Sequence, residues 1–245
     1  MPSLMATKTR KKKTSKAAPA KRVRPGRWLL RWGLRVVSGL FLIGVFLVIL
    51  WGTINPPTTW YMMSEKRRLG SVDQHWVPME SIAPVMARSA VAAEDANFCL
   101  HWGFDVGAIR SAIESGGNRG ASTISQQVVK NVFLWHGRNW TRKALEAGLT
   151  PLVEALWSKE RILEVYLNVA EFDEGVFGVE AAARHYFRVG PEALSPVQAA
   201  RLAAVLPNPK DRSAADPSSG LRRRAASIRD GAATIAVDGR SDCFE

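Results

Sequence analysis

Acidic side chains are absent from the first 64 residues, although the chain contains 22 of them. Residues 1–35 hold twelve of the 34 Lys and Arg, so the remaining residues carry 22 bases against 22 acids and the net charge of +12 belongs to the N-terminus. A folded domain with a basic surface for nucleic acid is therefore not indicated. Nucleic-acid binding by the basic segment alone is the weaker alternative to a role in membrane topology and lipid-headgroup contacts.

Cysteine is also scarce, since Cys99 and Cys243 are the only two. Two such distant cysteines exclude a disulfide-rich scaffold and lack the close spacing of a metal site. We expect both to be incidental, with pairing as the alternative if the domain lies in an oxidising compartment.

Residues 36–54 form a run of nineteen residues without a charge. As a helix that rises about 1.5 Å per residue, the run spans the roughly 30 Å hydrocarbon core of a bilayer. A cleavable signal peptide is the alternative, but its apolar region is usually about 7–15 residues long. The following WGTINPPTT also offers no small-x-small cleavage site. The run is therefore predicted to be an uncleaved transmembrane anchor.

The position of the basic residues predicts the topology of the chain. Basic residues favour the cytoplasmic side, so residues 1–35 are expected to form a cytoplasmic tail. This tail is expected to be disordered through Trp28. The residues after the transmembrane run are expected to lie beyond the inner face of the membrane. Residues 55–72 are expected to be a connector, residues 73–232 a folded domain, and residues 233–245 a fraying tail.

The folded part shows helix signals and no sustained alternation of apolar and polar residues, so no strand is predicted. Glycines predict a loop over residues 111–122. Leucines recur at helical spacing in the segment after Thr141, at positions 145, 149, 152 and 156, and Pro151 is expected to kink that helix. Ser81 precedes a predicted helical segment that extends through Phe98. Thr123 with Gln126 forms a predicted capping box for a segment that extends through Phe133. Further helix starts are predicted at Thr141, at Ser158, and at Ser195 with Gln198. The expected fold is a compact all-α domain.

Two adjacent carboxylates, Glu94 and Asp95, occur in the first of these helices. Ala90, Val91 and Phe98 lie one turn away. Partial desolvation by such neighbours raises a carboxyl pKa toward the range of an acid–base catalyst. The alternative is that both carboxylates are solvated surface charges.

Two further clusters carry charge. The segment GASTISQQVVKN begins a helix, whose free N–H groups suit an anion, and its polar face carries Gln127, Lys130 and Asn131. Arg142 and Glu146 are one helical turn apart. Taken singly, a solvated face and a surface ion pair explain these clusters equally well. Together, two carboxylates and two cations suit glycosidic-bond chemistry with a phosphate leaving group.

Between residues 73 and 209 the chain carries five segments in this order: AAEDANFCLHWGFD, RGASTISQQVVKN, RKALEA, SKERILEVYLN and GVFGVEAAARHYF. Their order and spacing resemble those of glycosyltransferase family 51, which includes the glycosyltransferase domains of class A penicillin-binding proteins. Because no transpeptidase domain is present in the sequence, the chain is expected to resemble the monofunctional members. The resemblance implies a lysozyme-like helical fold behind one N-terminal transmembrane helix, with the catalytic domain on the periplasmic side of the inner membrane.

The resemblance also implies a reaction, the polymerisation of lipid II into glycan strands. Glu94 is the expected general base, which takes the proton of the acceptor's GlcNAc 4-hydroxyl as this oxygen attacks C1 of the donor's MurNAc. A β-1,4 bond forms with inversion and undecaprenyl pyrophosphate leaves. Glu146 is expected to assist at the donor site, and Lys130 and Arg142 to contact the pyrophosphate.

Other motif positions have expected roles as well. The donor pocket is expected to be lined by Ser122, Thr123, Gln127, Asn131 and Lys143, whereas Asp95, Phe98 and His101 hold the first motif in shape. A divalent cation, Mg²⁺ or Mn²⁺, beside the pyrophosphate is left open. The expected partners are lipid II, the growing glycan strand, the membrane and proteins of a cell-wall synthesis complex, and no nucleic acid.

Two rival functions are considered. A lysozyme or lytic transglycosylase of the same fold would cut glycan, but a hydrolase has no need of Lys130 and Arg142 at a pyrophosphate. A non-catalytic scaffold would tolerate the loss of motif residues, and every residue that the reaction requires is present.

Overall fold

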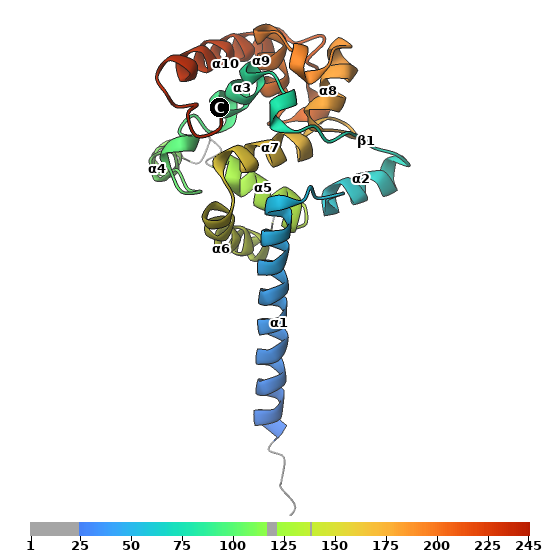
Figure 1. The fold of residues 1–245 in the computed structure, drawn as a ribbon, viewed down its shortest axis with the longest axis vertical. Helices are drawn as coiled ribbons and strands as arrows, with labels where there is room; N and C mark the ends of the chain where they lie inside the picture. The colour runs from blue at the N-terminus through green and yellow to red at the C-terminus, as the bar shows by residue number, and fades with distance from the viewer. Residues whose placement is uncertain (1–24, 117–121, 138) are drawn as a thin grey trace, which may run out of the picture. The chain divides into compact units, whose positions relative to one another are not determined.

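The computed structural model describes residues 25–116, 122–137 and 139–245 (Figure 1). The chain forms two compact units, residues 1–44 and residues 45–245. The described part of the first unit is helical and belongs to α1 (Pro25–Thr53), whose last turns belong to the second unit. Those turns are held there by side chains of the folded domain: Trp157 Nε1 donates to the Val48 carbonyl at 2.7 Å, and Arg161 donates to the Trp51 carbonyl at 2.9 Å.

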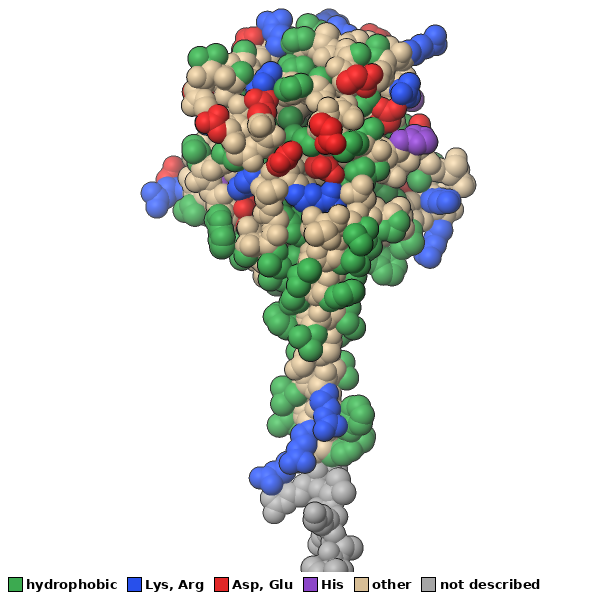
Figure 2. Space-filling model, in the orientation of Figure 1, with side chains coloured by type: hydrophobic (Ala, Val, Ile, Leu, Met, Phe, Trp, Pro, Cys, Tyr) green, Lys and Arg blue, Asp and Glu red, His purple; other side chains and the backbone are tan. Residues whose placement is uncertain are grey.

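Helix α1 is apolar along most of its length. Residues Gly26–Thr53 have a mean hydropathy of 2.4 over the most apolar window, and only 6% of that window is buried, so the helix is a candidate membrane span. Figure 2 shows hydrophobic side chains along the helix and Lys and Arg side chains at its N-terminal end. The disorder expected through Trp28 is wrong from Pro25 onward, where the helix already exists. Residues 1–24 of the expected tail lie outside the described residues.

The second unit is built mainly from helices, which confirms the all-α prediction. They are α2 (Trp60–Leu69), α3 (Pro84–Glu94), α4 (Val106–Glu114), α5 (Ile124–Phe133), α6 (Trp140–Leu156), α7 (Lys159–Val169), α8 (Gly178–Phe187), α9 (Pro196–Val205) and α10 (Ser219–Val237). Short 3₁₀ turns complete the unit: η1 (Met79–Ser81), η2 (Phe98–Leu100), η3 (Pro191–Ala193) and η4 (Pro209–Asp211). The expected connector therefore contains a helix, α2.

A small sheet contradicts the prediction of no strands. It consists of β1 (Asp73–Gln74), β3 (Val176–Phe177) and β2 (Glu171–Asp173) in that order, with β1 parallel and β2 antiparallel to β3. Strands of two or three residues are too short to show an alternating pattern in the sequence. Gly178 follows β3 with φ of 81°, and a Cβ there would lie 2.9 Å from the Asn168 carbonyl oxygen, so glycine is required.

The core joins two groups of helices. Helix α10 packs on α3 and α9, and α5 packs on α6 and α7 (Figure 1). Fully buried side chains such as Met86, Tyr166 and Leu202 fill the interior. Because α3 and α5 belong to different groups and both contribute to this core, the first two sequence motifs are brought together across the fold.

Most predicted helix starts are confirmed. Thr123 and Ser195 form capping boxes, and Ser158 caps α7. The cap predicted at Thr141 is wrong, because Asn139 caps α6 by accepting the Thr141 N–H at 2.7 Å. The cap predicted at Ser81 is also wrong, because Ser81 ends η1 and α3 begins at Pro84 without a side-chain cap.

Two predicted boundaries also differ from the structure. The helix expected through Phe98 ends at Glu94, where Asp95 leaves the helical conformation. Residues 111–114, expected in a loop, belong to α4, and residues 117–121 of that loop lie outside the described residues.

Helix α6 buries a polar side and only part of its leucine stripe. Leu145 and Leu156 are 44% and 47% exposed and Leu149 and Leu152 are partly buried against the core, whereas Glu146, Thr150 and Glu154 are buried. The helix continues through Pro151 to Leu156. The leucine spacing therefore predicts the helix correctly but not the burial of its polar residues.

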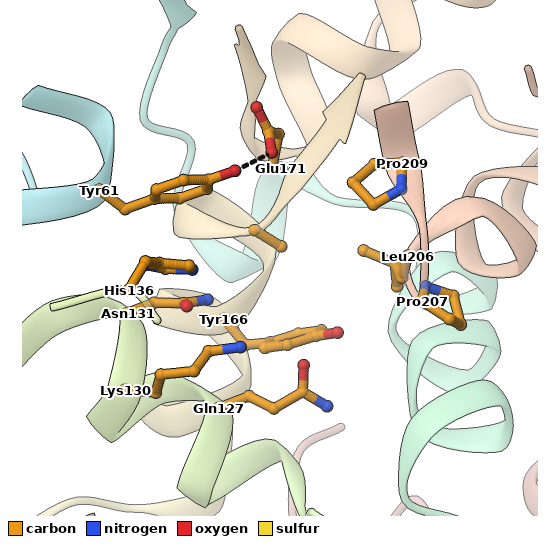
Figure 3. Close-up of a pocket in the computed structure, with 11 residues that line it drawn as sticks. Tyr61, Gln127, Lys130, Asn131, His136, Tyr166, Glu171, Leu206, Pro207 and Pro209 are labelled. Carbon is orange, nitrogen blue, oxygen red and sulfur yellow. Dashed lines mark hydrogen bonds between the residues drawn. The ribbon is translucent and has the colours of Figure 1, made fainter. Parts of the chain in front are cut away.

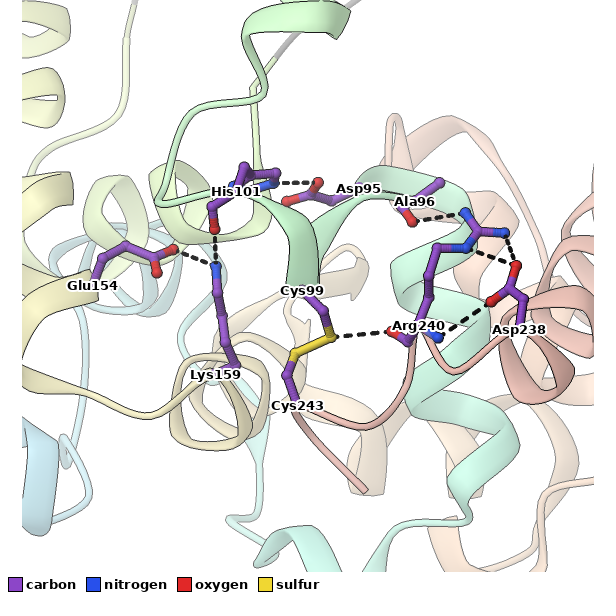
Figure 4. The surroundings of a disulfide bond; sticks show 9 residues. All are labelled: Asp95, Ala96, Cys99, His101, Glu154, Lys159, Asp238, Arg240 and Cys243. Atoms are coloured by element: carbon purple, nitrogen blue, oxygen red, sulfur yellow. Dashed lines mark hydrogen bonds and ion pairs between the residues drawn. A yellow bond between two sulfur atoms is a disulfide. The ribbon is translucent and has the colours of Figure 1, made fainter.

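The C-terminal residues are ordered, so the expected fraying is wrong. Helix α10 extends to Val237, Phe244 is 3% exposed, and Arg88 pairs with Glu245 at 2.6 Å. Cys99 and Cys243, expected to be incidental, form a disulfide bond (Figure 4). This bond joins the last residues to η2, which lies within the first motif.

Candidate active site

Glu94 is the last residue of α3, and its side chain is only 13% exposed. Its Oε2 accepts a hydrogen bond from Gln127 Nε2 of α5 at 2.9 Å, and Arg224 Nη2 of α10 lies 3.7 Å from its Oε1. Burial raises the pKa of the Glu94 carboxyl, an effect opposed by Gln127, Arg224 and Lys130. A mostly buried carboxylate with one neutral hydrogen-bond donor and a single guanidinium at 3.7 Å is suited to accept a proton.

Asp95 has a different environment from its neighbour. Its Oδ2 accepts the backbone N–H of Ile124 at 3.0 Å, at the start of α5, and its Oδ1 lies 2.8 Å from His101 Nε2. The carboxylate thus occupies a free N–H of the α5 N-terminus, where the helix dipole favours negative charge. Asp95 connects the first motif to the second, which supports its predicted role in holding the motif in shape.

Phe98 and His101 pack behind this connection. Phe98 is 1% exposed and meets the His101 ring edge-on, with the Lys159 ammonium 4.4 Å from the Phe98 ring centroid. Lys159 also donates to the His101 carbonyl at 2.8 Å and pairs with Glu154 at 2.8 Å (Figure 4). Phe98 and His101 therefore pack against the contact that joins the first motif to the second.

Helix α5 carries the polar residues predicted for the second motif. Thr123 caps the helix and donates its hydroxyl to the Gly103 carbonyl at 2.7 Å. Gln127, Lys130 and Asn131 point into a common pocket (Figure 3). Burial lowers the pKa of the Lys130 ammonium, Arg142 and Lys143 act in the same direction, and Glu146 and Glu94 oppose them. Lys130 is thus within electrostatic range of both candidate carboxylates.

Glu146 is held by two cations of its own helix. Arg142 Nη1 lies 2.7 Å from its Oε2, and Lys143 Nζ lies 2.5 Å from its Oε1, while the carboxylate itself is 3% exposed. Lys143 also reaches Ser122 Oγ at 3.3 Å, and Arg142 Nε donates to the Gly137 carbonyl at 2.9 Å. The third motif therefore forms a charged group of two cations and one anion.

Two pockets flank the Glu94–Gln127 hydrogen bond. One has a volume of about 200 Å³ and is lined by Tyr61, Gln127, Lys130, Asn131, His136, Tyr166, Ala170, Glu171, Leu206, Pro207 and Pro209 (Figure 3). The other, of about 290 Å³, is lined by Ala92, Ala93, Glu94, Asp95, Ala96, Asn97, Asp105, Ala108, Ser122 and Thr123. A candidate base between two pockets is suited to a reaction that joins two substrates.

The sequence patterns missed several pocket residues. Tyr61 donates to Glu171 Oε2 at 2.5 Å, and its ring stacks on His136 with the centroids 3.6 Å apart (Figure 3). Burial raises the pKa of the Glu171 carboxyl and lowers the pKa of His136 to about 4, so the imidazole is neutral at physiological pH. No local signal marks Tyr61, which lies in the expected connector and reaches Glu171 across 110 residues.

The side chains do not fit a resident divalent cation. Both Glu146 oxygens are occupied by Arg142 and Lys143. Across the described ranges, no group of three His, Cys, Asp or Glu side chains could hold a metal ion. Lys130, Arg142 and Lys143 contribute cationic side chains to this site.

Comparison with known proteins agrees with this geometry. Residues 62–232 match the family described as Transglycosylase. The "Biosynthetic peptidoglycan transglycosylase" of Jannaschia sp. (strain CCS1) is 59% identical over 214 residues, which cover 87% of this chain and 90% of the relative. The protein of the same name from Pseudomonas fluorescens (strain SBW25) is 48% identical over 223 residues, covering 87% and 93%. A third, from Yersinia pestis (strain Pestoides F), is 49% identical over 192 residues, covering 73% and 79%.

These matches cover every motif that builds the two pockets and the charged group, and they confirm the resemblance noted in the sequence. The chain belongs to the transglycosylase family.

Proposed function

We propose that the protein is a peptidoglycan glycosyltransferase that polymerises lipid II into β-1,4-linked glycan strands. The observation that carries the proposal is the buried Glu94 carboxylate, hydrogen-bonded by Gln127 between two pockets. The names of the relatives, biosynthetic peptidoglycan transglycosylases, supply the substrate class.

Glu94 acts as the general base in this proposal. A sugar hydroxyl is a weak nucleophile, so removal of its proton matters as the new bond forms. The 4-hydroxyl of the acceptor's GlcNAc gives its proton to Glu94, and its oxygen attacks C1 of the donor's MurNAc from the side opposite the leaving group. The configuration at C1 is inverted. The raised pKa of Glu94 makes the carboxylate a stronger base than an exposed glutamate.

The cations act on the leaving group. Departure of undecaprenyl pyrophosphate develops negative charge, which fixed positive groups stabilise in a partly desolvated site. Lys130, Arg142 and Lys143 are the proposed groups, with Ser122, Thr123 and Asn131 as further lining of the donor pocket. Glu146 holds Arg142 and Lys143 in place through its two oxygens and limits their mutual repulsion.

The proposed location is the periplasmic side of the inner membrane. Helix α1 is long and apolar enough to span a bilayer, and its N-terminal end is basic, as on the cytoplasmic side of a single-pass protein. The Cys99–Cys243 disulfide suits an oxidising compartment. This placement would bring the site close to a lipid-linked donor.

The test is an assay of the purified full-length protein with lipid II in detergent or vesicles. Lysozyme-sensitive glycan polymer and released undecaprenyl pyrophosphate are expected. Release of fragments from finished peptidoglycan, with no polymer from lipid II, would instead show a hydrolase or lytic enzyme of the same fold.

A further inference from the structure

Arg224 of α10 contacts the end of the catalytic helix α3. Its Nη2 lies 3.7 Å from Glu94 Oε1 and 3.4 Å from the carbonyl oxygen of Ala93, the residue before Glu94. The last carbonyls of a helix lack partners within the helix, so this contact places the guanidinium at the α3 C-terminus. Each Glu94 oxygen therefore has a neighbouring group, Gln127 at Oε2 and Arg224 at Oε1.

The position of Arg224 is set by the packing of α10. Leu221, Ala225 and Ile228 of this helix are buried, and α10 packs along α3 and α9. A Cβ at Gly231 would lie 3.3 Å from Ala92 Cβ, so α10 approaches the last turn of α3 closely. Arg224 is thus presented to Glu94 by a helix that is fixed at several points.

The C-terminal residues reinforce this arrangement. Arg240 donates to the Ala96 carbonyl at 3.0 Å, and Cys243 is bonded to Cys99 (Figure 4). Two arginines of the C-terminal segment therefore contact carbonyls on either side of the Glu94–Asp95 pair. The segment holds the backbone that carries the proposed base.

The guanidinium of Arg224 includes a buried nitrogen that makes no hydrogen bond within the described part of the chain, which is unfavourable for stability. Its Nε atom is buried and has no hydrogen-bond partner among the described residues. An unsatisfied buried donor costs free energy. A methionine at this position would avoid that cost, so stability alone does not explain the arginine.

We propose that Arg224 is a positioning residue that acts through Glu94. It fixes the carboxylate between Gln127 and the α3 C-terminus and keeps Glu94 in the ionised form that accepts the acceptor's proton. This inference rests on the proposed function, in which Glu94 is the base.

The other groups around Glu94 define what Arg224 adds. Asp95, which directly follows α3, raises the pKa of Glu94, and the Glu94 charge raises the pKa of Tyr166 on α7. Gln127 and Lys130 on α5 lower the pKa of Glu94. Lys130 is the other cation in this set, and the proposed reaction uses it at the pyrophosphate. Arg224 therefore provides a positive charge at Glu94 that is separate from the leaving-group cations.

The experiment compares Arg224→Met, Arg224→Lys and Arg223→Met in the full-length protein, with lipid II turnover measured from pH 5.5 to 8.5. Arg224→Met is expected to lower kcat/KM about fivefold at neutral pH, the size of one partly exposed charge interaction. The loss should grow as the pH falls, because Glu94 protonates at higher pH without the arginine. Arg224→Lys should restore the pH profile more than the rate, and the melting temperature of Arg224→Met should not fall.

Arg223→Met is the matched control, because Arg223 is the exposed neighbour on the same helix and the change in net charge is identical. It should leave the profile unchanged. An Arg224→Met profile parallel to that of the wild type, or a loss explained by a lower melting temperature, would overturn the inference. Glu94→Gln in the same assay separates the general-base role of Glu94 from the positioning role of Arg224. If Glu94→Gln is inactive while Arg224→Met is normal, only the role of Arg224 fails. If Glu94→Gln is fully active, the proposed base fails as well.

Discussion

The two candidate carboxylates, Glu94 and Glu146, are 13% and 3% exposed but have different partners. Glu94 has a neutral amide at hydrogen-bond distance and a guanidinium at 3.7 Å, whereas Glu146 has an arginine and a lysine at 2.7 and 2.5 Å. Desolvation thus dominates at Glu94 and raises its pKa. At Glu146, two charge-assisted contacts occupy both oxygens.

The same residue type is thus suited to different functions by its partners. Glu94 keeps a neutral amide at hydrogen-bond distance and one guanidinium at 3.7 Å, which leaves it able to accept a proton, while both Glu146 oxygens are occupied by cations. Glu94 lies at the C-terminal end of α3 and Glu146 within α6, and their different partners are the basis for the two proposed roles.

Glu94→Gln should have the largest effect, because it removes the proton acceptor while preserving shape and the contact with α5. Loss of a general base costs about 10²–10⁴-fold. Initial rates of lipid II polymerisation measure this loss. Glu160→Gln, on the exposed first turn of α7, is the control and should be as active as the wild type. Activity of Glu94→Gln within threefold of the wild type would contradict the assignment.

Glu146→Gln should reduce the rate by a smaller factor, on the order of 10²-fold, because the cations that face the pyrophosphate lose the group that positions them. Removal of one partner from a buried ion cluster should also lower the free energy of unfolding by roughly 3 kcal/mol. Thermal or denaturant unfolding measures the second effect. If the stability is unchanged, the buried cluster is not held in the way the structure shows.

Lys130→Met should lower turnover by about tenfold or more with little effect on folding, since a buried ammonium with a lowered pKa is costly to keep in the native state. The rate with lipid II and the melting temperature are the two readouts. A parallel loss of activity and melting temperature would indicate that Lys130 is structural instead.

Cys99→Ser should affect stability more than chemistry, because the disulfide ties Cys99 of the first motif to the C-terminal residues and closes a separation of 144 residues. A loss of about 2–4 kcal/mol in unfolding free energy is expected, with the rate at low temperature nearly normal. Reduction of the wild-type protein should reproduce the shift. An inactive but equally stable variant would show that the bond has a direct role in the site.

The local parts of the fold could be predicted from the sequence. Capping boxes at Thr123 and Ser195 depend on residues three positions apart, and a charge-free run predicts the apolar helix. The cap of α6 was misplaced by two residues because Asn139 competes with Thr141. Helix α6 shows the limit of periodicity, since it buries Glu146 while Leu145 and Leu156 are exposed.

The partners of the site residues could not be predicted from the residues alone. Gln127 is 33 residues from Glu94 and Arg224 is 130 residues away, and the chain carries no local signal for either contact. The Cys99–Cys243 disulfide likewise joins residues that are distant in the sequence, without a local signal for the pairing. The family motifs identified which residues belong together, while the roles proposed for Glu94 and Glu146 depend on contacts that only the fold supplies.

The most direct test of the contrast is the pH dependence of kcat/KM for lipid II in the wild type, Glu94→Gln and Glu146→Gln. A base whose pKa is raised by burial loses activity as the pH falls through that pKa, so the wild type should show an acid limb above the usual range of glutamate. Glu146→Gln should be slower but keep this acid limb, and the residual rate of Glu94→Gln should lack it. A limb that survives in Glu94→Gln and disappears in Glu146→Gln would show that Glu146, not Glu94, is the base.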